Sequence, residues 1–150
     1  MRNELSAVLD FAVARSQEAE AFFKRWAPQE ELPEIQAWFA RLAAGEHGRA
    51  EMLSRMHPEE LVSKTAAAPL LLDLLVRVRE PAGLTREKAI HLAAQRKRIT
   101  GCLYDRIAEL GGEACSFFRA MADEDRCAVC ELERYAKQLG TSKDDGAGGE

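Results

Sequence analysis

The chain has 150 residues, of which 47% are hydrophobic and 31% are charged, with a formal net charge of −4. This composition fits a soluble globular domain and excludes a disordered or membrane-spanning class, and the acidic balance gives no reason to expect nucleic acid or an anionic membrane as a partner. Because the four cysteines come without an export signal, we expect free thiols and a cytoplasmic location.

The first predicted helix spans residues 5–27, where apolar side chains recur every three or four residues, the period of an amphipathic helix. Ser16 is the one polar residue on its apolar stripe. Pro28 ends the helix because the residue before a proline is pushed out of the α region. A shifted register would turn Glu18 or Glu20 inward instead of Ser16, but neither of them lies on the stripe.

The second predicted helix runs from Pro33, which suits a first helical turn, to about residue 57. Its apolar stripe contains two charged residues, Glu46 and Arg49. His47 follows Glu46 directly and therefore points about 100° away from it, so we expect a surface histidine.

Residues 58–84 are less regular, and three prolines bracket short apolar pieces. The apolar run 70–76 is expected either to cover an open side of the fold or to form a dimer face. Thr85 is a suitable N-cap for a third long helix, which Gly111 and Gly112 then end.

The fourth predicted helix runs from about residue 113 to residue 139, and the tail 141–150 is expected to be disordered because it has almost nothing to bury. Residues 1–140 thus form one domain. The inward face of the fourth helix is predicted to carry Phe117, Ala120, Met121, Glu124, Cys127, Ala128 and Tyr135.

Four long amphipathic helices without a period-two strand pattern predict an all-α fold, an antiparallel four-helix bundle. The connections are short within the first and last helix pairs and long between helices two and three. This pattern predicts one long crossover between helices two and three, as in ferritin-like folds.

The two halves of the chain resemble each other. In the odd helices, Ser16-x6-Phe23 corresponds to Lys97-x6-Tyr104. In the even helices, the pattern repeats as Phe39-x6-Glu46-x2-Arg49 and Phe117-x6-Glu124-x2-Cys127.

The segments ARSQEAEAFFKRWA, WFARLAAGEHGRAEML, TGCLYDRIAEL and FFRAMADEDRCAVCELERY resemble, in order, the four helices of the rubrerythrin branch of the ferritin-like superfamily. The resemblance covers about residues 3–139. It implies a di-iron centre held by a Glu from each odd helix and a Glu-x-x-His from each even helix. It also implies a homodimer, since related bundles commonly pair.

The family's six ligand positions keep only two glutamates in this chain, so the resemblance implies a degenerate di-iron site. Two negative and two positive side chains would meet there, and their charges sum to zero without a metal. We therefore expect a core of Glu46–Arg49 and Lys97–Glu124 pairs, in one combination or another, and no cofactor. The six positions are Ser16, Glu46, Arg49, Lys97, Glu124 and Cys127.

Three functions follow from this pattern. The first is a non-catalytic binding or assembly protein that has lost di-iron chemistry, so that we lean against an enzyme. The second is a non-haem iron oxidoreductase or iron-handling protein that uses iron at an altered site of Glu46, Glu124 and Cys127. The third is a redox sensor in which Cys127 reacts and Cys130 resolves.

Overall fold

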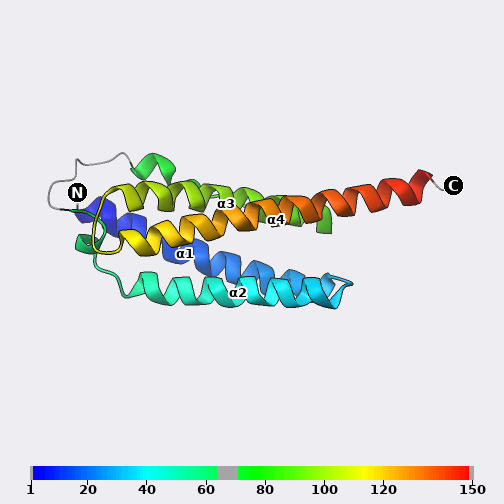
Figure 1. Ribbon diagram of the computed structural model, residues 1–150, viewed down its shortest axis with the longest axis horizontal. Helices are drawn as coiled ribbons and strands as arrows, with labels where there is room; N and C mark the ends of the chain where they lie inside the picture. The colour runs from blue at the N-terminus through cyan, green and yellow to red at the C-terminus, as the bar shows by residue number, and fades with distance from the viewer. Residues whose placement is uncertain (1, 64–70, 149–150) are drawn as a thin grey trace.

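The computed structural model describes residues 2–63 and 71–148. Within these ranges it has four α-helices and three short 3-10 helices (Figure 1), and the predicted all-helical class is confirmed. The α-helices are α1 (Arg2–Trp26), α2 (Pro33–Ser54), α3 (Arg86–Glu109) and α4 (Cys115–Gly148). The 3-10 helices are η1 (Ala27–Gln29), η2 (Pro58–Glu60) and η3 (Leu71–Leu74).

Local sequence signals set several of the helix ends. Thr85 caps α3, because its hydroxyl oxygen accepts a hydrogen bond from the backbone N–H of Lys88 at 3.3 Å, satisfying one free donor of the first turn. Pro33 stands at the first position of α2, where the missing N–H has no helical partner to lose. Gly111, with a φ of 70°, follows the end of α3. All three signals act as the sequence predicts.

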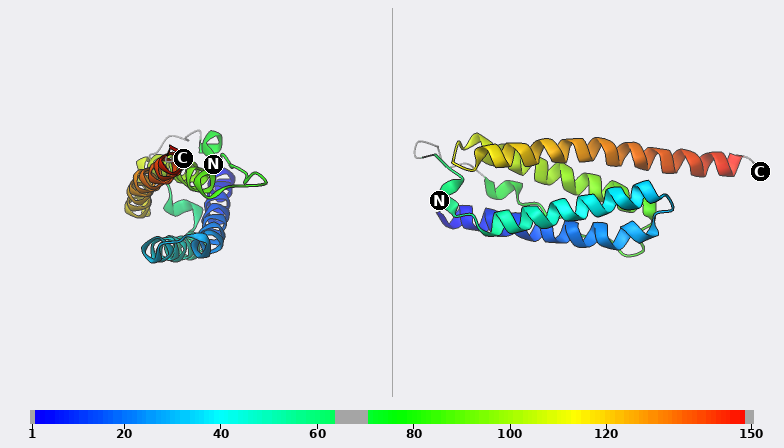
Figure 2. Two further views of the ribbon diagram at one scale, coloured as in Figure 1. Left: turned by 90° about the vertical axis from the view of Figure 1, so that its right-hand side faces the viewer. Right: turned by 60° about the horizontal axis from the view of Figure 1, so that its bottom comes forward.

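The helices form two antiparallel hairpins, α1 with α2 and α3 with α4, while α2 and α3 run in the same direction (Figures 1 and 2). The chain after α2 first contacts the far end of α3, since Ser63 N–H donates to the carbonyl of Leu110 at 3.0 Å. It later contacts the near half of α3, where Arg96 donates two hydrogen bonds to the carbonyl of Val78, at 3.0 and 2.8 Å.

Residues 71–80, which we name the strap, lie along the seam between α1 and α3 (Figure 2). Arg77 of the strap contacts Glu18 of α1 at 3.1 Å, and the carbonyl of Val78 accepts from α3 as described above. Leu71 is buried in the core, whereas Leu72 and Val76 are about half exposed. The run 70–76 thus partly covers the bundle as expected, although Leu70 lies outside the described residues.

The core consists of two apolar clusters at opposite ends of the bundle. One cluster contains the first half of α1 and the last turns of α3, with Leu5, Leu103 and Phe118 among its members. The other contains Phe39 and Leu132. Among the described residues, six buried polar ones belong to neither cluster: Ser16, Glu30, Glu46, Arg49, Lys97 and Asp125.

The fourth helix, α4, ends later than the sequence predicts. It continues to Gly148 instead of stopping near residue 139, and it extends past the other helices (Figure 1). The added residues contain glycines but no proline, and glycine only weakens a helix where proline would break it. The disorder expected of residues 141–150 stays a prediction, and residues 149–150 lie outside the described chain.

Candidate functional site

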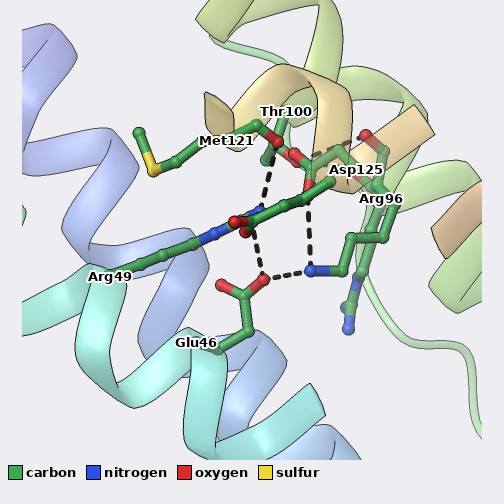
Figure 3. Close-up of polar contacts among 8 residues, drawn as sticks. Glu46, Arg49, Arg96, Thr100, Met121 and Asp125 are labelled. Carbon is green, nitrogen blue, oxygen red and sulfur yellow. Dashed lines mark hydrogen bonds and ion pairs between the residues drawn. The ribbon is translucent and has the colours of Figure 1, made fainter. Parts of the chain in front are cut away.

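Four charged side chains form a closed ring inside the bundle (Figure 3). Nη1 of Arg49 lies 3.1 Å from Oε1 of Glu46 and 2.7 Å from Oδ1 of Asp125. Nζ of Lys97 donates to the same Oε1 of Glu46 and lies 3.4 Å from the same Oδ1 of Asp125. Each carboxylate therefore contacts both cations, and each cation contacts both carboxylates. We call these four residues the charge ring.

The charge ring is almost completely removed from solvent. Glu46 is 4% exposed, Arg49 8%, Lys97 6% and Asp125 0%. A single unpaired charge at this depth would cost several kcal/mol, whereas paired and hydrogen-bonded charges come close to breaking even. Burial by itself would lower the pKa of Arg49, but Asp125 and Glu46 outweigh it and the pKa is raised. The guanidinium therefore keeps its charge.

Neighbouring groups use most of the remaining hydrogen-bonding capacity of the ring. Thr100 donates to Oδ2 of Asp125 at 2.8 Å, and Nη2 of Arg49 donates to the carbonyl of Met121 at 3.2 Å. The guanidinium also lies 5.9 Å from the centre of the Tyr104 ring, close enough for a cation–π contact. Such a satisfied network fixes the relative positions of α2, α3 and α4.

The structure corrects part of the inner face predicted for the fourth helix. Asp125, not Glu124, points into the bundle, and Cys127 is exposed, whereas Met121, Ala128 and Tyr135 are buried as predicted. The side chain of Glu124 is 69% exposed and reaches the ring only by accepting from Nη2 of Arg49, at 3.0 Å. The predicted Glu46–Arg49 pair is present, but Lys97 pairs with Glu46 and Asp125.

This register was missed because each inner residue has a chemically similar neighbour. Phe117 and Phe118, like Glu124 and Asp125, offer the same side-chain type in two adjacent frames. A signal for the correct frame exists in the sequence, because Asp125 is flanked at helical spacing by Met121, Val129 and Leu132.

The thiols lie outside the ring. Cys127 and Cys130 are both exposed, so the structure does not gather the proposed altered metal site of Glu46, Glu124 and Cys127. In the described ranges, no group of three or more His, Cys, Asp or Glu is arranged to hold a metal ion. Residues three apart on a helix have Cβ atoms about 5–6 Å apart, longer than the roughly 3.5–4.5 Å of a disulfide. A Cys127–Cys130 disulfide would therefore distort α4.

Ser16 lies where the sequence predicts, 2% exposed on the inner face of α1. It lines a cavity that also touches Lys97 and Glu46. Of the alternative candidates on this helix, Glu18 lines the same cavity and pairs with Arg77, whereas Glu20 pairs with His47.

The residues of the ring do not fit a di-iron centre. Glu46 and Asp125 are its only carboxylates, and both are engaged by Arg49 and Lys97. At ~5 Å and an effective dielectric constant of ~20, each of these cations would repel a doubly charged ion by about 6–7 kcal/mol. The donor set is too small, and its charge is already neutralised.

The chain matches no known family model, no curated protein and no solved structure. Among the described residues, no helix is long and apolar enough to cross a membrane. Function must therefore be argued from the chemistry of the side chains.

A second buried polar cluster, at one end of the bundle, was not predicted. Glu30 is 2% exposed, accepts a hydrogen bond from the hydroxyl of Tyr135, and lies 3.8 Å from Nε of Arg86. Burial, together with the hydrogen bond to Glu30, raises the pKa of Tyr135. The cluster ties the α1–α2 connection to α3 and α4. Glu30 lies outside the regular helices, where periodicity gives no signal for burial.

Proposed function

We propose that this protein is a cytoplasmic, rubrerythrin-like member of the ferritin-like superfamily in which the charge ring stands in place of a di-iron centre. Its function is non-catalytic, the binding or assembly of a partner by a rigid bundle. The helix directions, with α2 and α3 running the same way, support a ferritin-like topology with one long crossover (Figure 1). The half-to-half sequence repeat supports it as well.

One observation carries the proposal: Arg49 and Lys97 are fixed between the two buried carboxylates, Glu46 and Asp125. A cation bound by protein atoms needs negative or neutral donors with free lone pairs. Here Arg49 and Lys97 already contact Oε1 of Glu46 and Oδ1 of Asp125, and Thr100 donates to Oδ2 of Asp125. The ring therefore holds the helices together and leaves no electrophilic metal to perform redox chemistry.

The direct test is the metal content of the purified protein. We expect wild-type protein from an iron-replete culture, analysed by inductively coupled plasma mass spectrometry, to contain far less than one iron per chain. Titration of the apoprotein with Fe²⁺ under anaerobic conditions should give no saturable binding. Two iron atoms per chain would contradict the proposal.

A gain-of-binding variant tests the corrected register. This variant restores the family's ligand types at the four positions where the chain lacks them, and it keeps Glu46 and Asp125. Its substitutions are Ser16→Glu, Arg49→His, Lys97→Glu and Ala128→His. We expect this variant to bind divalent metal, because it removes both ring cations and adds two carboxylates and two imidazoles.

The matched control changes only the position in α4. It carries Cys127→His in place of Ala128→His, with the other three substitutions unchanged. Because Cys127 is exposed, we expect this control to bind metal at least tenfold more weakly, about 1.4 kcal/mol. Equal affinities would contradict the placement of Ala128 at the family's histidine position.

Homodimer formation is part of the proposal. The half-exposed apolar side chains Leu72 and Val76 on the strap support it, because burying them in an interface would be favourable. Light scattering coupled to size-exclusion chromatography should give twice the mass of one chain. A Leu72→Lys, Val76→Lys double variant should shift the mass towards the monomer if the strap is the interface.

A further inference from the structure

A small cavity lies between α1, α3 and the strap, next to the charge ring. Its volume is about 30 Å³, and a cavity needs at least roughly 10–15 Å³ of such space to hold one water molecule. The walls are mostly apolar, with Phe22, Phe23, Ile99 and Val76 among them. The polar part of the lining includes Ser16 and Lys97.

Two buried polar atoms on residues that line this cavity have no hydrogen-bond partner within the described chain. One is Oγ of Ser16, and the other is Nε of Arg15. Burial is the main cause of the raised pKa of Tyr104, and its hydroxyl lies near enough to Ser16 for Ser16 to act in the direction of a lower pKa, but no hydrogen bond of ordinary geometry joins Oγ of Ser16 to a partner among the described residues. Nε of Arg15 lies 3.8 Å from the nearest carboxylate oxygen of Glu18, beyond hydrogen-bond distance. A buried polar group without a partner costs about 1–3 kcal/mol, so two such groups beside one cavity point to an occupant.

We propose that the cavity binds an ordered water molecule that accepts or donates a hydrogen bond at Ser16. A water in such a site needs two to four polar partners. Ser16 provides both a donor and an acceptor, Arg15 provides a donor, and Glu46 and Thr100 also line the cavity. The water joins the charge ring to the surface between the strap and α1.

Water fits the charges around the cavity better than an anion such as chloride does. Lys97 is already balanced by Glu46 and Asp125. Arg96 lies 3.6 Å from Glu18, and burial is the main reason that its pKa is lowered. A neutral molecule uses the unsatisfied donors without adding a negative charge beside Glu18 and Glu46.

The test is a pair of crystal structures, of the wild-type protein and of Ser16→Ala, at a resolution that shows ordered water. We expect a density peak about 2.7–3.2 Å from Oγ of Ser16 in the wild type, and no peak there in Ser16→Ala. Ser6→Ala, on the same helix but away from the cavity, is the control and should retain the peak. A bromide soak distinguishes chloride, since a halide site would show anomalous density.

A solution measurement complements the crystals. In Ser16→Val a methyl group enters the cavity, expels the water and leaves Nε of Arg15 without a partner, so we expect a lower Tm than in the wild type. If the cavity is dry, the same methyl group fills empty space and raises the Tm. A higher Tm, an empty cavity, a direct Ser16–Tyr104 hydrogen bond or a bromide peak would each overturn the proposal.

Discussion

At the scale of single residues, the stability cost of a substitution in the charge ring depends on which charges remain in the core. Glu46 is the shared partner of Arg49 and Lys97, and it lies on the same helix as Arg49. Without Glu46, Asp125 is the one buried carboxylate left beside two buried cations, and Glu124 reaches Arg49 only from an exposed position. Loss of Glu46 therefore leaves a positive charge poorly compensated in the core.

We predict that Glu46→Ala lowers the free energy of unfolding by roughly 3–5 kcal/mol, the cost of breaking a buried ion pair from one side. Urea denaturation followed by circular dichroism measures this difference. Glu51→Ala, whose side chain is 57% exposed on the same helix, is the control and should change stability by less than about 0.5 kcal/mol. Equal effects of the two substitutions would show that the ring contributes nothing beyond a surface charge.

His47, on the outer side of the α1–α2 hairpin, is expected to make the stability of the protein depend on pH. Nδ1 lies 3.1 Å from Glu20, and Nε2 lies 3.1 Å from Glu51. The hydrogen bond to Glu20, followed by the charges of Glu20 and Glu51, raises the pKa of His47. Folding therefore favours the protonated ring, and its contribution is complete below the unfolded pKa of about 6.5 and lost as the pH rises through the folded value.

We accordingly predict that His47→Gln destabilises the protein at a pH of about 5.5 and has little effect at a pH of about 9. Thermal unfolding at both pH values measures the difference. His91→Gln is the control, because Nε2 of His91 lies 4.0 Å from its acidic neighbour Glu87. A His47 effect that does not change with pH would contradict the prediction.

At the residue scale, the sequence predicts the inward polar residues of three helices but not that of the fourth. The inward positions of Ser16, Glu46, Arg49 and Lys97 follow from apolar periodicity, because the flanking residues of α1, α2 and α3 leave a single frame. In α4 two adjacent frames fit almost equally well. The apolar spacing around Asp125 favours its frame slightly, and its burial in the structure decides between the two. Which of the charges pair with each other depends on distances between helices, and a sequence does not contain those.

At the scale of elements, the turn between α3 and α4 depends on glycine for a reason that helix propensity does not reveal. A Cβ on Gly112 would lie 2.3 Å from the carbonyl oxygen of Glu60 and 2.4 Å from the carbonyl carbon of Leu61. These are backbone atoms of the chain after α2, so they cannot rotate away. Gly112, which the sequence predicts to help end the third helix, is therefore also the point where the α3–α4 turn contacts the connection after α2.

We predict that Gly112→Ala destabilises the protein by at least about 1–3 kcal/mol, as overpacking of a tight contact does. Gly45→Ala is the matched control within α2, because a Cβ there meets nothing within 4 Å. It should stabilise the protein by roughly 0.5–1 kcal/mol through better helix propensity. Urea denaturation of both variants measures the contrast, and a stabilising Gly112→Ala would contradict the close contact.

At this scale the sequence was most informative. Thr85, Pro33 and Gly111 act locally, so their effects on helix ends do not depend on the rest of the fold. The end of α4 was misplaced because no residue after Leu139 stops a helix sterically. The strap was predicted only as short apolar pieces, since its position depends on the seam between α1 and α3.

At the scale of the whole molecule, the charge ring separates two apolar clusters that an uncharged centre would join. Buried ion pairs are often no more stable than apolar side chains of similar volume. We therefore infer that the ring contributes more to the choice of one helix register than to the total stability.

We predict that the fourfold variant Glu46→Leu, Arg49→Met, Lys97→Met, Asp125→Leu is as stable as the wild type or more stable, by up to roughly 1–4 kcal/mol. Its amide NMR spectrum should show broader or additional peaks, because the apolar centre no longer specifies one register. The single Glu46→Ala variant is the comparison, since it should be strongly destabilised. A fourfold variant much less stable than the wild type would show that the ring has a large net stabilising effect.

The position of the strap has a consequence for the order of folding. Each hairpin is made of neighbouring helices and can form early from local contacts. Arg77 of the strap needs Glu18 of α1, and the carbonyl of Val78 needs Arg96 of α3, so these contacts exist only after both hairpins have docked. We infer that the strap settles after the rate-limiting step, and that weakening it speeds unfolding while leaving the refolding rate unchanged.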